Sequence, residues 1–225
     1  MNKTDKRAAG LWSGGKDSCL ACCMAIEQGY KVTTLINFYR GERSCSHGLP
    51  APLIADQANA AGMLIIQRDV NQKTYEEVFR KTMAELKRKG IEYLICGDIY
   101  LLEHRKWLER VVTEENLFPL FPLWNKPTEE LLADFIKRGF EAIIVATRSQ
   151  FMGEEWLGVP IDACFGQKIE GLPHKVDACG ERGEYHTLVT CGPDWPGRLS
   201  VLKTAPSQEN DHCFLNIAAW QVTGK

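Results

Sequence analysis

The chain has 225 residues, enough for one large domain or two small ones with a substantial buried core. Hydrophobic residues make up 44% and charged residues 25%, which excludes a disordered chain. A formal net charge of -2 excludes the uniformly basic surface of a general nucleic-acid binder, and we see no strong nucleic-acid signal.

Nine cysteines, an odd number without the spacing of a disulfide framework, indicate reduced thiols. We find no secretory segment and no apolar run near the roughly 20 residues that span a bilayer. The composition therefore predicts a soluble, cytoplasmic protein without a membrane partner. A homo-oligomer is compatible with it.

Short apolar runs alternate with helical patterns through the first two thirds of the chain. The runs lack polar–apolar alternation, as expected of strands covered on both faces. Predicted strands are 8–13, 32–38, 64–69, 93–97 and 142–147, and predicted helices are 17–28, 53–61, 74–89, 103–115 and 128–138. Repeated β-α-β units of this kind predict an α/β fold with a doubly wound, five-stranded parallel sheet.

The last third of the chain has a different character. From about residue 151, Gly, Pro and Cys become frequent, and strands are predicted at 185–190, 198–204 and 213–222. The Pro-containing stretch 118–127 is the predicted boundary. We therefore expect one domain at 1–122 and a smaller C-terminal α+β domain at 123–225.

The most informative segment joins the first predicted strand to the first helix and reads Ser-Gly-Gly-Lys-Asp-Ser at 13–18. Gly14 and Gly15 permit a tight turn and a close backbone approach to an anion. Ser13 and Ser18 supply hydroxyls, and the following helix offers free N–H groups at its positive end. This pattern predicts a phosphate site at the carboxyl end of a parallel strand, where ligands of such sheets bind.

The spacing is neither that of a Walker A loop nor that of a dinucleotide fingerprint. It resembles the pyrophosphate loop of the adenine-nucleotide alpha hydrolases, whose members cleave ATP between the alpha and beta phosphates. That resemblance implies a Rossmann-like ATP-binding domain at 1–122. It also implies that the loop holds the pyrophosphate portion of ATP, with Asp17 contacting Mg²⁺.

Three further segments narrow the resemblance. The first segment, residues 96–100, reads Cys-Gly-Asp-Ile-Tyr and is followed by Arg105. The second, residues 122–124, reads Pro-Leu-Trp, and the third, residues 177–187, reads Asp-Ala-Cys-Gly-Glu-Arg-Gly-Glu-Tyr-His-Thr. Together with the loop, they resemble the diphthine–ammonia ligase family from about residue 9 to about residue 193.

The resemblance implies an ATP-dependent amidation. The family's enzymes adenylate the carboxylate of diphthine, a modified histidine of a translation elongation factor. Ammonia then attacks, and AMP and pyrophosphate leave. The implied partners are a carboxylate acceptor, small or protein-borne, ammonia and an elongation factor, and the implied cofactors are ATP and Mg²⁺.

Site candidates follow from the loop and from these segments. The candidates for nucleotide binding are Ser13, Gly14, Gly15, Lys16, Asp17, Ser18, His47 and Gly97, with Asp17 also the metal candidate. The candidates for catalysis are Asp98, Arg105, Glu181, Glu184 and His186, which offer cationic and acid–base groups.

The chain departs from the family pattern in two places. Residue 2 is Asn, so no N-terminal Cys is available for a glutaminase, and ammonia is expected to be free or delivered by a partner. The loop expected to line the acceptor pocket departs from the family pattern at Leu101, Leu102 and Glu103. This departure bears on diphthine as the acceptor more than on the use of ATP.

Other interpretations stay open. Cys19, Cys22 and Cys23 share one helix face, which favours core packing over a metal site or a thiolation site. The competing functions are a pyrophosphate-loop ligase or thiolase acting on another small molecule or on tRNA, and a non-catalytic ATP-binding interaction module. Asp98 fits a turn cap, Glu181 and Glu184 fit solvated loop carboxylates, and His47 fits a surface loop.

Overall fold

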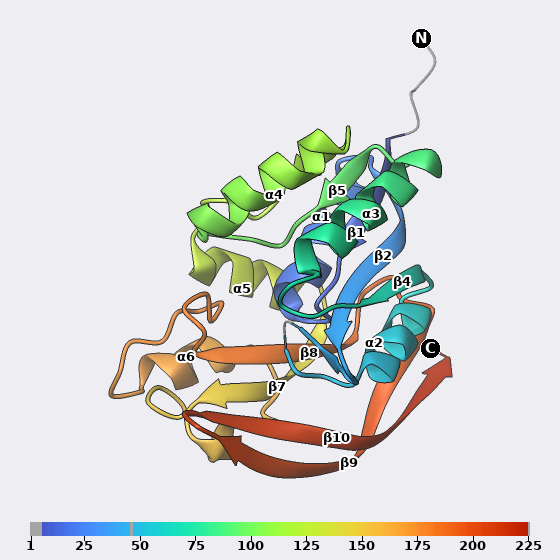
Figure 1. Cartoon of the computed structure of the whole chain (residues 1–225). Helices are drawn as coiled ribbons and strands as arrows, with labels where there is room; N and C mark the ends of the chain where they lie inside the picture. The colour runs from blue at the N-terminus through green and yellow to red at the C-terminus, as the bar shows by residue number, and fades with distance from the viewer. Residues whose placement is uncertain (1–5, 46, 225) are drawn as a thin grey trace.

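The computed structural model describes residues 6–45 and 47–224 and contains two sheets (Figure 1). The first sheet has five parallel strands in the order β4-β2-β1-β5-β6, and the short β3 pairs antiparallel with the end of β2. These strands are β1 (Arg7–Leu11), β2 (Lys31–Arg40), β3 (Arg43–Ser44), β4 (Leu64–Asp69), β5 (Tyr93–Ile95) and β6 (Phe118–Leu120).

Helices cover both faces of the parallel sheet, as the doubly wound prediction requires. They are α1 (Lys16–Glu27), α2 (Ala51–Ala60), α3 (Tyr75–Arg88), α4 (Leu102–Glu114) and α5 (Thr128–Lys137). Successive residues of β1 point to opposite faces: Ala8 packs in the cluster that includes α1, α2 and α5, whereas Ala9 packs with α3 and α4. The fold class is confirmed.

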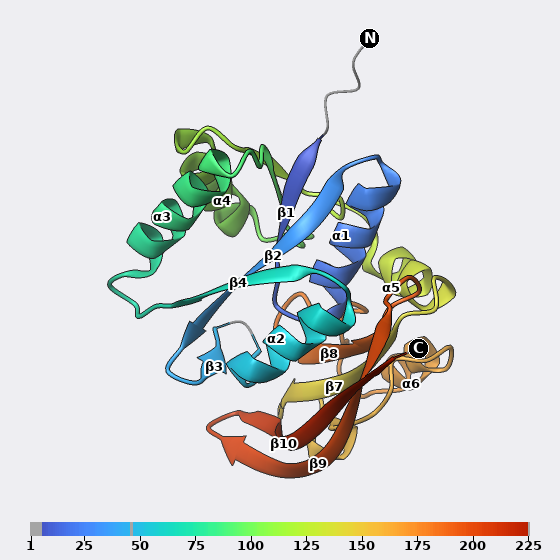
Figure 2. The ribbon, with the colours of Figure 1, turned by 90° about the vertical axis from the view of Figure 1, so that its right-hand side faces the viewer.

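The second sheet is antiparallel, in the order β8-β7-β10-β9, and lies beyond the carboxyl ends of the parallel strands (Figure 2). Its strands are β7 (Glu141–Arg148), β8 (Tyr185–Cys191), β9 (Gly197–Glu209) and β10 (His212–Gly224). The short helices η1 (Glu154–Trp156) and α6 (Phe165–Glu170) lie between β7 and β8.

One strand assignment was wrong. The predicted strand 142–147 forms β7 of the antiparallel sheet, and the fifth parallel strand is β6, inside the stretch expected to be a boundary. β6 is short and contains Pro119, which an edge strand tolerates because it leaves one side of the ladder unpaired. β7 resembles a parallel strand because helices and loops bury it on both faces.

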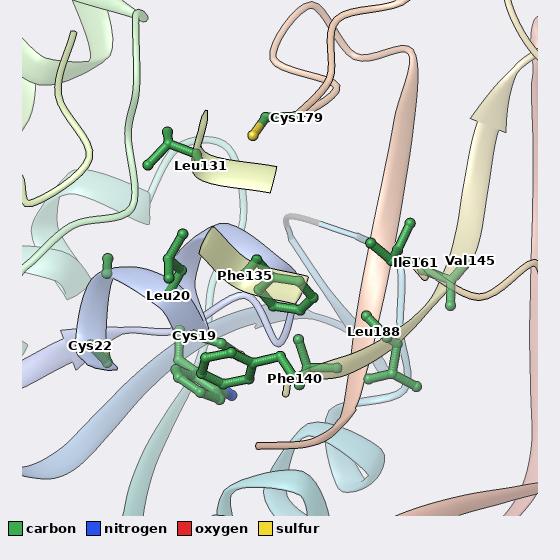
Figure 3. Close-up of a cluster of buried hydrophobic side chains, with 14 of the residues drawn as sticks. Cys19, Leu20, Cys22, Leu131, Phe135, Phe140, Val145, Ile161, Cys179 and Leu188 are labelled. Carbon is green, nitrogen blue, oxygen red and sulfur yellow. The ribbon is translucent and has the colours of Figure 1, made fainter. Parts of the chain in front are cut away.

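A continuous apolar cluster joins the two sheets. Figure 3 shows Cys19 and Leu20 of α1 beside Phe135 of α5. Phe140, just before β7, and Leu188 of β8 lie close by. Phe135 and Phe140 stack with ring centroids 4.9 Å apart. Each sheet therefore buries apolar surface against the other, which fixes the distance between the end of β1 and the edge of β8. Throughout residues 6–45 and 47–224, every helix is too short or too polar to span a bilayer.

Candidate functional site

The site forms where the phosphate loop of residues 13–18 meets the edge strand β8. One cavity of about 260 Å³ is lined by Ser13, Asp17, Ser18, Gly97 and Asp98, among others. A second cavity of about 330 Å³ is lined by Lys16 and by much of the segment 179–187. Asp17, His47, Leu101 and Glu181 line both. The fold thus joins two sequence motifs more than 150 residues apart at one site.

The glycines of the loop are required by close contacts. Gly14 has a φ of +83°, and a Cβ at this position would lie 2.6 Å from Ile54 Cδ1. A Cβ on Gly15 would lie 2.3 Å from His47 Cε1. The loop therefore leaves no room for side chains at these positions, because Ile54 and His47 already occupy the space.

Hydroxyl groups complete the loop. The Gly15 N–H donates to Ser13 Oγ over 3.2 Å, and the Ser18 hydroxyl donates to the Gly15 carbonyl over 3.0 Å. Across the cavity, the end of β5 comes close to α1: a Cβ on Gly97 would lie 3.0 Å from the Ser18 amide nitrogen. The structure thus brings the expected residues Ser13, Ser18 and Gly97 around the start of α1, where N–H groups favour an anion.

Lys16 points toward the C-terminal segment and lines the second cavity. Lys16 is 4% exposed. Its ammonium donates to the Cys179 carbonyl and pairs with the Asp17 carboxylate at 2.9 Å. The ammonium also lies 5.0 Å from the Tyr185 ring centroid. Burial opposes the charge of Lys16, but Asp17, Tyr185 and Cys179 together outweigh it and the pKa of Lys16 is raised. The lysine therefore stays protonated and holds the two motifs together.

Two histidines stack beside the loop. The rings of His47 and His186 have centroids 4.7 Å apart, and His47 Nδ1 lies 3.1 Å from the Thr187 carbonyl oxygen. Burial, followed by the charges of its neighbours, lowers the pKa of His47 well below its ordinary value. Burial and Lys16 lower the pKa of His186 to about 4. Both rings are neutral near pH 7 and are available as hydrogen-bonding groups.

Asp98 follows β5 and forms an ion pair with His104 of α4. The hydrogen bond that His104 donates to Asp98 raises the pKa of His104. His104 was not among the predicted site residues, although both residues line the smaller cavity. Its position six residues after Asp98, in the first turn of the following helix, is the signal that could have identified it.

Glu181 is the carboxylate that reaches both cavities from the C-terminal segment. It accepts a hydrogen bond from the Tyr100 N–H over 3.4 Å. Burial, with a further contribution from Asp17, raises the pKa of Glu181 to about 7. A group with this pKa can exchange a proton at neutral pH.

Glu184 has a different environment from Glu181. It is fully buried and accepts hydrogen bonds from the N–H groups of Asp177 (3.0 Å) and Arg182 (2.9 Å). Asp177 in turn accepts from the Cys179 N–H at 2.9 Å. Glu184 thus closes the turn that presents Glu181 and lies outside the described lining of both cavities.

The structure does not bring Arg105 to the site. Its guanidinium carbon lies 4.8 Å from the Phe121 ring centroid and 4.4 Å from that of Trp124. Arg105 also pairs with Glu109 one turn along α4 at 2.7 Å. Among the described residues that line the two cavities, Arg105 does not occur.

Cys19 and Cys22 belong to the core, as predicted, whereas Cys23 is only partly buried against it and accepts a hydrogen bond from Arg138. Cys19 and Cys22 are each 2% exposed, and a Cβ on Gly10 would lie 2.5 Å from Cys22 Sγ. Burial raises the pKa of Cys22 to about 12, which leaves the thiol unreactive at neutral pH. Within residues 6–45 and 47–224, no three His, Cys, Asp or Glu side chains cluster as ligands of a metal ion.

A glycine-rich anion site at the carboxyl edge of a doubly wound parallel sheet defines a nucleotide-binding α/β protein. Comparison with known protein families identifies the chain more specifically than the fold does. Residues 6–118 match the diphthamide synthase N-terminal domain and residues 127–221 match the diphthamide synthase C-terminal domain. The chain belongs to the diphthamide synthase family, and the family expected from residues 96–100 and 177–187 is confirmed.

Individual relatives agree with this assignment. The diphthine–ammonia ligases of Bos taurus and Homo sapiens are each 26% identical over 87% of this chain and 82% of their own length. The Schizosaccharomyces pombe ligase is also 26% identical, but this chain covers only 39% of it. A predicted tRNA methyltransferase subunit from Methanocaldococcus jannaschii aligns with a TM-score of 0.44 and 16% identity over 81% of this chain and 96% of its own.

Proposed function

We propose that this protein is an ATP-dependent ligase that adenylates a carboxylate and amidates it with ammonia, releasing AMP and pyrophosphate. The observation that carries the proposal is the meeting of the phosphate loop with the segment 179–187 at two cavities that share Asp17 and Glu181. The shared names of the relatives, diphthine–ammonia ligase, support the same reaction.

The loop side fits the phosphates of ATP. The Ser13 and Ser18 hydroxyls and the start of α1 are proposed to form the cradle for the anion, because Ser13, Asp17 and Ser18 line the first cavity. ATP would supply the adenylyl group that activates the acceptor carboxylate. Asp17 is the proposed Mg²⁺ contact, because Mg²⁺ in such sites binds one or two carboxylates together with phosphate oxygens.

The opposite side fits the acceptor and the nucleophile. Glu181 is the proposed acid–base group, because its pKa of about 7 lets it take a proton from the attacking nitrogen. His186 lines the second cavity as a neutral hydrogen-bonding group. Asp98 pairs with His104 at the first cavity. Arg105 and Glu184 are proposed to support the site from outside it, through α4 and the 177–184 turn.

The acceptor is proposed to be diphthine on a translation elongation factor, by analogy with the named relatives. Leu101 lines both cavities with an apolar, half-exposed side chain, so the acceptor would meet a nonpolar contact at this position. The division into a nucleotide-binding part (1–122) and an acceptor-binding part (123–225) belongs to this proposal. A reducing, cytoplasmic place of action agrees with the free cysteines.

The test is amidation of a diphthine-bearing elongation factor with ATP, Mg²⁺ and ¹⁵N-ammonium. We expect the label to appear in the modified histidine, as measured by mass spectrometry of the peptide that contains it. The reaction should depend on ATP. An unlabelled peptide, under conditions where a known diphthine–ammonia ligase labels it, would refute diphthine as the acceptor.

A further inference from the structure

Gln57 of α2 is fully buried directly beneath the phosphate loop, outside every motif used above. Its Oε1 accepts a hydrogen bond from Trp12 Nε1 over 2.8 Å. Its Nε2 donates to the Gly14 carbonyl over 2.8 Å and to the Val189 carbonyl over 2.7 Å. Both amide hydrogens and the amide oxygen are therefore used, which a buried glutamine achieves only in a well-defined position.

The Gly14 carbonyl receives two hydrogen bonds. Besides Gln57, the Val189 N–H donates to it over 2.9 Å, so both lone pairs of the oxygen are occupied. In a trans peptide the carbonyl and the next N–H point in opposite directions. Anchoring the Gly14 carbonyl toward α2 and β8 thus turns the Gly15 N–H the other way, toward Ser13 Oγ at the cavity.

The same contacts join the loop to the unpaired edge of β8. The order β8-β7-β10-β9 leaves one side of β8 without a strand partner. The loop covers this side, because Val189 binds Gly14, and Thr187 Oγ1 accepts from the Lys16 N–H over 3.0 Å. Gln57 bridges the two partners by contacting both Gly14 and Val189.

We propose that Gln57 is a positioning residue for nucleotide binding, which holds the phosphate loop against β8 and keeps the Gly15 N–H on Ser13 Oγ, so that Ser13 faces the first cavity in a fixed orientation. The inference rests on the proposed ATP-binding function of the loop. Gln57 is absent from the described lining of both cavities, so it acts through the backbone of Gly14. Without its two donors, the Gly14–Gly15 peptide loses one of its anchors and can rotate.

The test measures the ATP dissociation constant by calorimetry with Mg²⁺ present and no acceptor. Gln57→Glu keeps the acceptor for Trp12 but loses both donors, and Gln57→Met removes all three hydrogen bonds at nearly the same volume. We expect each to weaken ATP binding roughly 10-fold. Gln67→Glu is the matched control, because Gln67 is a partly buried glutamine that binds Asn37 and the Ala51 carbonyl rather than the loop.

A pH series separates positioning from general loss of structure. Burial raises the pKa of an introduced carboxyl, and its protonated form regains one donor. Lowering the pH from about 8 to about 6 should therefore restore part of the ATP affinity in Gln57→Glu but not in Gln57→Met. Other titrating groups near the loop, Lys16, Asp17, His47 and Glu181, are common to both variants, so Gln57→Met corrects for them.

The outcomes are distinct. Weak ATP binding in both Gln57 variants, with normal binding in Gln67→Glu and recovery at low pH in Gln57→Glu alone, supports the proposal. ATP affinity equal to wild type in folded Gln57 variants, judged by their melting temperatures, overturns it. Equal loss in Gln67→Glu overturns it as well. A wild-type chain that does not bind ATP refutes the proposed function itself, and this inference with it.

Discussion

The two sides of the site are built by different means. The phosphate loop consists of backbone groups and hydroxyls, and its glycines have no space for a side chain. The facing segment 177–187 carries titratable groups. The pKa of Glu181 is about 7, and the buried Glu184 accepts hydrogen bonds from backbone N–H groups. We infer that the loop side positions the nucleotide and the segment side exchanges protons. The following predictions test this division of roles.

The largest effect is expected from Asp17→Asn, which keeps the side-chain shape but removes the charge that pairs with Lys16 and would contact Mg²⁺. The rate of ATP–pyrophosphate exchange should fall roughly 1,000-fold. The control is Asp134→Asn, which removes a carboxylate of α5 that pairs with Arg138. This variant should retain the wild-type rate. A normal exchange rate in folded Asp17→Asn would remove Asp17 from the site.

Glu181→Gln should lower the rate of amide formation roughly 100-fold at pH 8. At a constant concentration of unprotonated ammonia, the wild-type rate should rise with pH through about 7, because the ionised form of Glu181 takes the proton, and this rise should vanish in the variant. The measurement is a pH profile of amide formation. Glu77→Gln, which removes an exposed carboxylate of α3 that pairs with Lys81, should leave the profile unchanged. A profile with the same rise in Glu181→Gln would assign it to another group.

Glu181 also has a consequence for stability. Its pKa is higher in the folded chain than the ordinary value of 4.5, so the folded state favours the protonated form. Ionisation therefore costs stability, and this cost grows as the pH rises from about 4.5 through about 7. Thermal melts should show Glu181→Gln gaining stability relative to wild type across that range. A constant difference between the two proteins would contradict the raised pKa.

A smaller effect is expected from Gly15→Ala. The added Cβ would displace His47 and press on the Thr187 carbonyl 3.2 Å away, so the KM for ATP should rise roughly 10-fold. Gly166→Ala on α6 is the matched control, because a Cβ there meets no atom within 4 Å. If both alanine variants have the wild-type KM, the loop is less tightly packed than described.

The smallest effect concerns the cysteines. Cys22→Ala should lower the free energy of unfolding by about 1 kcal/mol and leave AMP formation at saturating substrate unchanged. Urea denaturation and an AMP assay measure the two quantities. Loss of AMP formation in a folded variant would support the thiolation alternative instead.

Much of the fold follows from local patterns that the sequence displays directly. The helix α3 has its buried side chains Phe79, Met83 and Leu86 at three- and four-residue spacing, so its existence and its buried face were predictable. The short β6 was missed because three residues with a proline carry almost no periodic signal. β7 was assigned to the wrong sheet because burial on both faces gives the same apolar run in either sheet.

The site was predictable only in part. Ser13 to Ser18 form a motif whose chemistry is local, and the loop was recognised from it. Arg105 and Glu184 were candidates because they lie in or next to the segments that resemble the family. Whether their side chains face the site, or instead pair with aromatic rings or backbone N–H groups, depends on tertiary contacts. Gln57 was missed for the same reason, because a single glutamine on a helix does not reveal what the fold brings next to it.

The most direct test of the account is an analysis of the nucleotide products formed from ATP with Mg²⁺, ammonium and a diphthine-bearing elongation factor. Chromatography separates AMP from ADP, and a coupled assay detects pyrophosphate. We predict AMP and pyrophosphate in equal amounts from the wild-type chain, and neither from Asp17→Asn. Release of ADP and phosphate, or ATP that is bound but unchanged, would contradict an adenylating ligase.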